Sequence, residues 1–161
     1  MYSAPDFENK LCQVDDLAAR VALLPRPLVV TNGRFDVLHR GHVTYLGQAR
    51  ALGASLIIGV NSDASVKRLG KEGDRPINPL QDRMIVLAAL ESVSLVVPFD
   101  DDTPLNLINI CRPDILVKGG DWQVENIVGA REVTDWGGTV HSIPFLHERS
   151  TTALLKKIRS L

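Results

Sequence analysis

The sequence predicts an α/β fold in which a parallel five-stranded sheet is covered by helices on both faces. Short apolar runs, which suit strands buried on both faces, alternate along the chain with longer amphipathic segments. Glycine and proline residues mark many of the boundaries between them. Parallel neighbours need a crossover connection, usually a helix, so this alternation favours a parallel sheet over a series of hairpins.

The predicted strands are residues 28–30, 56–60, 95–97, 115–117 and 139–143. The predicted helices between and after them are residues 41–52, 80–90, 104–111, 125–136 and 151–159. Residues 61–74 are polar and charged and predict a loop. Ahead of the first strand, apolar residues at helical spacing predict an appended helix over residues 6–24, which Pro25 and Pro27 end. We therefore expect an N-terminal helical extension of residues 1–27 and a domain of residues 28–161.

Composition narrows the class of protein. The chain has 161 residues, a length that suits one domain, and its net charge of −1 gives no general attraction to nucleic acid or an anionic membrane. Cys12 and Cys111 match no metal or redox spacing and are expected to be reduced and structural. No run approaches the roughly 20 apolar residues that span a bilayer, and the N-terminus has no signal-peptide pattern. We expect a cytoplasmic protein without nucleic-acid or membrane partners.

The loop after the first strand, TNGRFDVLHRGH at residues 31–42, carries the most chemistry. Gly33 permits a tight turn, and Gly41 lies at the start of a helix, where free N–H groups favour phosphate. His39 and His42 are three residues apart and can project to one side of the first helical turn. Two imidazoles there suit the stabilisation of developing phosphate charge. A metal site is the alternative, but a third ligand is missing nearby, so we predict no metal ligands.

This loop resembles the HxGH signature of the nucleotidyltransferase superfamily that includes the cytidylyltransferases. Further segments follow in the family's order: Asn61-Ser62-Asp63, Arg75-Pro76-Ile77-Asn78-Pro79 with Arg83, Val117 to Trp122, and Ser150-Thr151-Thr152. The combination looks most like the heptose-1-phosphate adenylyltransferases, which make ADP-activated heptose for lipopolysaccharide. In many bacteria that domain follows a sugar kinase, and here about 27 residues precede it. The resemblance implies a Rossmann-like sheet and a stand-alone adenylyltransferase.

The resemblance also implies roles for individual residues. His39, His42 and Lys67 are expected to be catalytic. The nucleotide is expected to contact Thr31, Asn32, Gly33, Arg34, Phe35, Asp36, Gly41, Arg83, Lys118, Gly119, Asp121, Ser150 and Thr151. The sugar phosphate is expected to contact Asn61, Asp63, Arg68, Lys71 and Arg75.

Several of these roles have structural alternatives. Asp36 either orients a histidine or shapes its loop. Arg83, a cation near a helix N-terminus, is electrostatically unfavourable there, which favours ligand binding. Ser150 or Thr151 caps the last helix, whose first N–H groups would meet phosphate oxygens. After the fourth strand, Lys118 to Gly120 could admit a flat base, with Asp121 on the ribose.

The implied reaction is in-line attack by a sugar phosphate on the α-phosphate of ATP, with Mg²⁺ accompanying the triphosphate. We also expect a homo-oligomer, either a dimer or a tetramer. One alternative is a cytidylyltransferase acting on glycerol 3-phosphate or a similar alcohol phosphate. Related cytidylyltransferases carry an Arg-Thr stretch before the final Ser-Thr-Thr, whereas this chain has residues 145–149, FLHER, which weakens that reading. A non-catalytic nucleotide-binding module is the alternative of another class.

Overall fold

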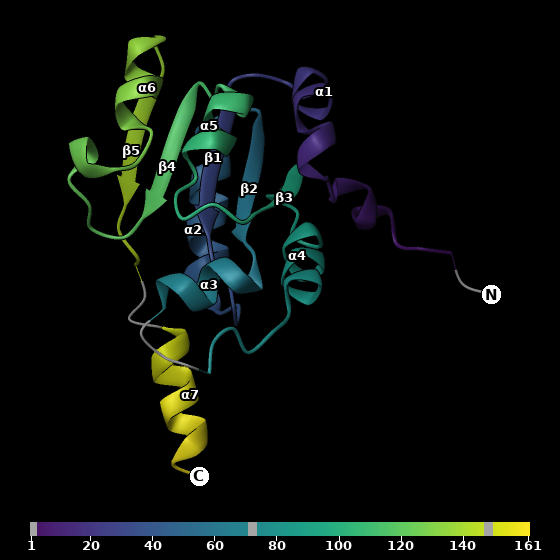
Figure 1. Ribbon diagram of the computed structural model, residues 1–161, viewed down its shortest axis with the longest axis vertical. Helices are drawn as coiled ribbons and strands as arrows, with labels where there is room; N and C mark the ends of the chain where they lie inside the picture. Colours follow the sequence, from purple (N-terminus) through teal and green to yellow (C-terminus); the bar gives the residue numbers. More distant parts are fainter. Residues whose placement is uncertain (1–2, 71–73, 147–149) are drawn as a thin grey trace.

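A five-stranded parallel sheet forms the centre of the protein. The computed structural model describes residues 3–70, 74–146 and 150–161. The strands are β1 (Leu28–Gly33), β2 (Ser55–Asn61), β3 (Leu95–Phe99), β4 (Ile115–Gly119) and β5 (Thr139–Ile143). Their spatial order is β3-β2-β1-β4-β5 and every neighbouring pair is parallel (Figure 1). The predicted fold class is confirmed. The strand order reverses between β1 and β4, where sheets of this kind bind ligands.

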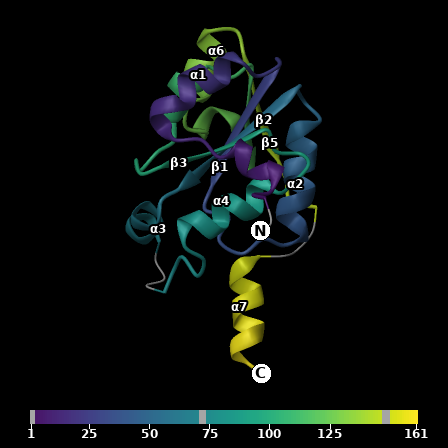
Figure 2. The ribbon, with the colours of Figure 1, turned by 90° about the vertical axis from the view of Figure 1, so that its right-hand side faces the viewer.

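Helices cover both faces of the sheet (Figure 2). On one face α2 (Arg40–Arg50) and α4 (Leu80–Ala88) bury residues such as Leu46 and Leu87 against the strands. On the other face lie α1 (Leu17–Ala22), α5 (Leu105–Cys111) and α6 (Ala130–Asp135). All seven residues of β2 are buried because the strand is central and covered on both sides. No helix of the described residues is long and apolar enough to cross a membrane.

The helix expected over residues 6–24 is not continuous. Two 3₁₀ helices, η1 (Asp6–Lys10) and η2 (Val14–Asp16), precede α1. Between η1 and η2, Leu11 forms a parallel bridge with Val96, and the Cys12 N–H donates to the Val96 carbonyl at 2.9 Å. Pairing with β3 breaks the helix because it needs extended backbone, and it protects an edge of the sheet.

The helix expected over residues 125–136 is also interrupted. A 3₁₀ helix, η3 (Val124–Asn126), is separated from α6 by Gly129, whose φ is +88°. A Cβ at Gly129 would lie 2.6 Å from Ile108 Cδ1, so the chain passes too close to α5 for another residue type.

The segment predicted as a polar loop contains a helix, α3 (Asp63–Leu69). Ser62 caps it, its hydroxyl accepting the Ser65 N–H at 3.0 Å, and Ser65 and Val66 are buried. Polarity alone concealed this helix because only one side of it faces the core. The last helix, α7 (Thr151–Arg159), follows the expected bounds and projects away from the rest of the molecule (Figures 1 and 2).

Candidate active site

His39 begins the site as the N-cap of α2. Its backbone is extended, with φ −143° and ψ 172°, and its Nδ1 accepts the Gly41 N–H at 3.1 Å. An imidazole nitrogen that accepts a hydrogen bond is unprotonated, so neutral His39 carries its proton on Nε2. Nε2–H is therefore available to donate to an anion. We expected the Gly41 N–H to contact phosphate, but it donates to His39 Nδ1 instead. This hydrogen bond fixes the tautomer of the His39 ring.

His42 lies against His39. The two rings are stacked with centroids 4.0 Å apart, and the ring of Phe35 meets His42 edge-on at 5.5 Å. Burial, and then the neighbouring His39, lower the pKa of His42 to about 4. Burial also lowers the pKa of His39. Both imidazoles are therefore neutral near pH 7 before ligand binds, and a bound anion would raise their pKa values.

Close packing between Gly33 and Phe35 shapes the same loop. Phe35 has a φ of +46°, which is uncommon for a bulky residue. A Cβ at Gly33 would lie 2.9 Å from Phe35 Cε2, so glycine allows the ring to fold under the end of β1. Phe35 thereby reaches His42 and acts as a packing residue with 7% of its surface exposed.

A cavity of about 370 Å³ opens at the carboxyl ends of β1, β2 and β4. It is lined by Asn32, Gly33, Arg34, Asn61, Leu69, Asp102, Thr103, Pro104, Lys118 and Val128. A smaller cavity of about 120 Å³ shares Asn32, Pro104, Lys118 and Val128 with it and adds Trp122, Asn126 and Ile127. The structure thus brings five predicted site residues together at the point where the strand order reverses.

Two cations, Arg34 and Lys118, line this cavity, and the one carboxylate in its lining, Asp102, pairs with Arg68. Burial, and then the positive charge of Arg34, lower the pKa of Lys118. An anion bound between two positive charges offsets their mutual repulsion and favours their charged forms. Lys118 Nζ also lies 5.9 Å from the centre of the Trp122 ring, within cation–π range. The pair therefore marks the cavity as a site for phosphate or another anion.

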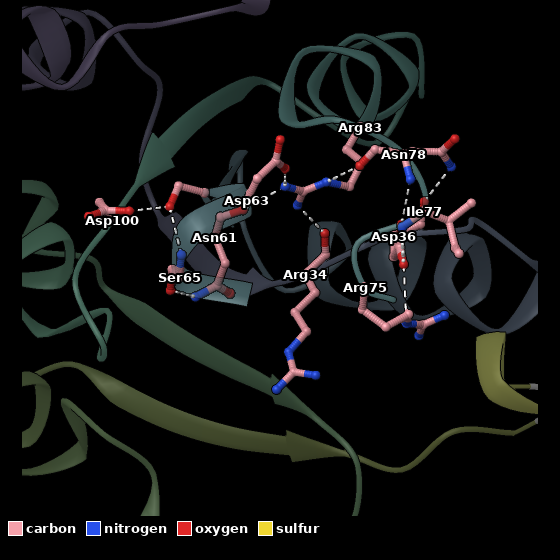
Figure 3. A network of polar contacts seen from close by, with 11 residues as sticks. Arg34, Asp36, Asn61, Asp63, Ser65, Arg75, Ile77, Asn78, Arg83 and Asp100 are labelled. Carbon is pink, nitrogen blue, oxygen red and sulfur yellow. Dashed lines mark hydrogen bonds and ion pairs between the residues drawn. The ribbon is translucent and has the colours of Figure 1, made fainter. Parts of the chain in front are cut away.

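Arg83 has a different role from the one predicted. Its side chain is 0% exposed and forms four hydrogen bonds (Figure 3). It donates to the carbonyls of Asn78, Arg34 and Asn61 at 3.0, 2.6 and 2.9 Å, and to the Asp63 carboxylate at 2.7 Å. No surface remains for a ligand, so Arg83 joins the loops after β1 and β2 instead of contacting the nucleotide. The Asp63 carboxylate and the three carbonyls stabilise the positive charge of Arg83, which would otherwise be unfavourable near the N-terminus of α4.

Asp36 shapes its loop, the second of the two roles considered for it. Its buried carboxylate accepts the N–H groups of Ile77 and Asn78 at 2.8 and 2.9 Å and pairs with Arg75 Nε at 3.3 Å (Figure 3). Asn78 Nδ2 returns a bond to the Asp36 carbonyl at 2.6 Å. The Arg75 Nη1 atom is buried without a hydrogen-bond partner among the described residues.

Thr31 and Thr151 also serve the fold. Thr31 is fully buried, and its hydroxyl bonds to that of Tyr45, so it is not a ligand contact. Thr151 Oγ1 donates to the Val37 carbonyl at 3.1 Å and ties the start of α7 to the histidine loop. Ser150 caps α7 as predicted, its hydroxyl accepting the Ala153 N–H at 3.0 Å.

Other predicted residues lie apart from the cavity. Lys67 and Asp121 are exposed and contribute nothing to its lining. Arg68 pairs with Asp100 and Asp102 on the surface. Gly119 sits under aromatic rings: a Cβ there would lie 2.9 Å from the Phe145 ring. Lys71 lies outside the described residues.

Sequence reasoning missed the segment after β3. Asp102, Thr103 and Pro104 line the cavity, and the rule that functional loops follow parallel strands could have found them. Tyr45, inside α2, is a core residue: burial raises its pKa to about 12, and its ring contacts Phe145 with centroids 5.7 Å apart.

A profile of the cytidylyltransferase-like family matches residues 30–158, a range that includes all the site residues described above. The chain belongs to this family. It is 55% identical, over 98% of both chains, to a D-beta-D-heptose 1-phosphate adenylyltransferase of Bordetella bronchiseptica. It is 58% identical over 132 residues to the bifunctional protein HldE of Citrobacter koseri, and there the match covers 82% of this chain and 28% of the relative.

Solved structures of cytidylyltransferase-like form agree with the fold. A lipopolysaccharide core biosynthesis protein of Thermoplasma volcanium superposes with a TM-score of 0.60 at 25% identity, covering 76% of this chain and 98% of the other. A pantothenate synthetase of Thermus thermophilus gives 0.58 at 18% identity, covering 89% and 70%, and at that identity shares the fold alone. The family profile and the 55% identity to the Bordetella enzyme show that the chain is a nucleotidyltransferase, which confirms the predicted enzyme class.

Proposed function

We propose that this nucleotidyltransferase transfers AMP from ATP to D-glycero-β-D-manno-heptose 1-phosphate, giving ADP-heptose and pyrophosphate for lipopolysaccharide core biosynthesis. The observation that carries the proposal is the 55% identity to the Bordetella heptose 1-phosphate adenylyltransferase along 98% of both chains. The geometry supports the same chemistry, because two cations, Arg34 and Lys118, line one cavity, and the stacked histidines lie further along the loop that follows the same strand, β1. We further propose a cytoplasmic location, where ATP is available.

In this reaction an oxygen of the sugar phosphate attacks the α-phosphorus of ATP. A new P–O bond forms as the bond between the α-phosphorus and the bridging oxygen breaks, and the electron pair leaves with pyrophosphate. A phosphate monoester has a second pKa of about 6, so its attacking oxygen is already largely ionised near neutral pH. No strong base is needed, and positioning with charge stabilisation supplies the catalysis.

We assign each site residue a proposed contact with the substrates. His39 donates from Nε2–H to a phosphate oxygen, and His42, stacked on it, faces the same charge. Arg34 and Lys118 hold phosphate oxygens in the larger cavity. Trp122 and Val128 line the smaller cavity beside it, which suits the adenine base. Arg75 offers its buried Nη1 to the sugar phosphate.

The start of α7 supplies further donors. The first N–H groups of a helix have no partner within it, and the dipole there favours negative charge. Ser150 satisfies the Ala153 N–H, and the bond from Thr151 to the Val37 carbonyl holds the helix start beside the His39 loop. The free N–H groups of Thr151 and Thr152 are therefore directed at the triphosphate.

We propose that Mg²⁺ enters with ATP and offsets the charge of its phosphates. Within residues 3–70, 74–146 and 150–161, no three His, Cys, Asp or Glu side chains are grouped to hold a metal ion. The phosphate oxygens of the nucleotide and water would then supply most of its ligands.

Pyrophosphate release with the heptose phosphate tests the proposal, comparing ATP with CTP and GTP. We expect rapid release with ATP only. Strong release with CTP and glycerol 3-phosphate would favour the cytidylyltransferase alternative. ATP binding without pyrophosphate release for any acceptor would favour a non-catalytic binding module. The comparisons favour the adenylyltransferase over both.

A further inference from the structure

Asn61, the last residue of β2, is buried and yet lines the larger cavity. Only 6% of its surface is exposed, and it forms part of the wall of the cavity of about 370 Å³. Its backbone carbonyl accepts a hydrogen bond from Arg83 Nη2 at 2.9 Å, and the residue pairs with Phe99 of β3. The backbone of Asn61 is therefore held from two sides, so its side chain meets the cavity from a fixed position.

Ser65 determines which end of the Asn61 amide faces the cavity. Asn61 Nδ2 donates to Ser65 Oγ at 3.0 Å (Figure 3). Ser65 Oγ in turn donates to the Asp101 carbonyl at 3.3 Å. A hydroxyl has one proton, so with that proton on the carbonyl, Ser65 Oγ can only accept from Asn61. Turning the amide over would place two acceptors against each other, so Nδ2 stays on Ser65 and Oδ1 lies on the other side.

The Asn61 Oδ1 oxygen is left as an acceptor for a ligand. No residue in the described part of the chain donates a hydrogen bond to it. Ser65, on the Nδ2 side, is fully buried, whereas Asn61 itself reaches the cavity. Buried polar side chains nearly always make their hydrogen bonds. An acceptor that is oriented but unpaired at a cavity wall therefore indicates a hydrogen-bond donor on the ligand.

Asp102 adds a second acceptor on the same side of the cavity. Its Oδ1 oxygen accepts the Arg68 Nε–H at 3.1 Å, and none of the described residues donates to its Oδ2. Asn61 ends β2 and Asp102 follows β3, so both acceptors lie toward the β3 edge of the sheet. Arg34 and Lys118 come from β1 and β4, on the other side. The cavity therefore has a cationic side and an acceptor side.

A ligand that matches both sides is an anion at one end and carries hydrogen-bond donors at the other. A triphosphate brings several negative charges, which the Asp102 carboxylate would repel, and acceptor oxygens, which the Asn61 oxygen cannot bind. A phosphorylated sugar has one phosphate and several hydroxyls, each of which can donate. The larger cavity therefore suits the phosphate acceptor better than the triphosphate of the nucleotide.

We propose that Asn61 is a specificity-determining residue for the acceptor: its Oδ1 accepts a hydrogen bond from a sugar hydroxyl, while the phosphate of the sugar lies on the side of Arg34 and Lys118. This inference rests on the proposed function, because it takes the acceptor to be a sugar phosphate. Ser65 is a positioning residue, which acts through the Asn61 amide. A site built in this way discriminates against a phosphate ester without hydroxyls, because its oriented acceptor then stays unpaired.

Calorimetric binding of two phosphate esters to the full chain tests the inference. D-glycero-β-D-manno-heptose 1-phosphate carries ring hydroxyls, whereas cyclohexyl phosphate has a ring without them. Asn61→Leu keeps a similar shape and removes the polar atoms. We expect it to weaken binding of the heptose phosphate about 10-fold or more and to leave cyclohexyl phosphate unchanged, because only the first ester loses a hydrogen bond. Asn109→Leu, which removes an exposed amide from α5, is the matched control and should bind both esters as wild type does.

A second variant, Ser65→Ala, tests the orientation of the amide. It leaves Asn61 in place and removes the group that holds Nδ2, so the amide is free to turn its N–H groups toward the cavity. The KM for the heptose phosphate should rise about three-fold or more, while kcat and the KM for ATP stay as in wild type. A change of all three constants together, with a lower Tm, would show a purely structural role and overturn the positioning by Ser65.

Two results would overturn the role of Asn61. Equal binding of the heptose phosphate by wild type and Asn61→Leu would mean that the amide does not contact the sugar. Equal weakening of both esters would mean that it acts on the phosphate. Failure of the proposed function gives a different pattern: wild type then forms no nucleotide sugar from the heptose phosphate. In that case glycerol 3-phosphate is compared with ethyl phosphate, and a loss confined to the hydroxylated ester would still support Asn61 as the selecting residue.

Discussion

His39 combines a structural and a chemical task in one side chain, and a substitution can separate them. Asn is also a good N-cap, so His39→Asn should keep α2 capped while removing the Nε2–H donor. We expect kcat to fall by about 100-fold or more, as for the loss of one transition-state donor, with little change in Tm. Steady-state kinetics with thermal denaturation measure both effects. Arg40→Ala, at the exposed neighbour, is the control and should retain most activity; an equal loss there would contradict the assigned role.

The pH dependence of stability reports on His42. Because its folded pKa, about 4, lies below the ordinary 6.5, the unfolded chain binds a proton more readily in that interval. Stability due to neutral His42 is therefore complete above about pH 6.5 and is lost as the pH falls toward 4. Urea unfolding at several pH values should show a smaller acid-induced loss for His42→Asn than for wild type. Parallel curves for the two proteins would show that His42 is not held neutral.

The main effect of substituting Arg83 should be on the stability of the fold. Removing one member of a buried, hydrogen-bonded charge network leaves its partners unsatisfied, at a cost of about 3–5 kcal/mol. We expect Arg83→Met to lower the free energy of unfolding by that order, while Arg131→Met, at an exposed position, changes it by less than about 0.5 kcal/mol. Denaturant titration of both variants checks this. A stable Arg83→Met protein with weakened ATP binding would restore the ligand role originally predicted.

At the scale of elements, comparing alanine substitutions at two glycines separates the cost of close packing from the cost of backbone strain. Gly129 and Gly137 have nearly equal φ values of +88° and +90°, but only Gly129 faces a neighbour, Ile108, at 2.6 Å from an added Cβ. Both alanine variants bear left-handed strain of about 1 kcal/mol, and Gly129→Ala should add about 1–3 kcal/mol from overpacking of the core. Chemical denaturation should rank the two variants in that order. Equal losses would mean that α6 can shift away from α5.

The elements also show what sequence could and could not provide. The five strands were predictable because buried parallel strands read as continuous apolar runs. The broken helices at residues 6–24 and 125–136 were not, because one depends on pairing with distant Val96 and the other on contact with Ile108. Within the site, the histidine loop was readable as a local motif. The burial of Arg83 was not, since its partners come from three separate segments.

At the scale of the whole molecule, the order of the strands places the site. β1 and β4 are neighbours although residues 34–114 lie between them in sequence, and the end of β4 brings Lys118 to the same cavity as Arg34, which follows β1. The network of Arg83 and Asp36 then joins the loops after β1 and β2 to the start of α4. This architecture is the basis on which we propose that the cavity binds phosphate groups of the substrates.

The most direct measurement of the central claim is identification of the product. The protein would be incubated with ATP, Mg²⁺ and either the β- or the α-anomer of D-glycero-D-manno-heptose 1-phosphate, and the mixture analysed by mass spectrometry and phosphorus NMR. The account predicts ADP-heptose and an equal amount of pyrophosphate with the β-anomer. Formation of no nucleotide sugar from either anomer, under conditions where the Bordetella enzyme forms it, would contradict the assignment.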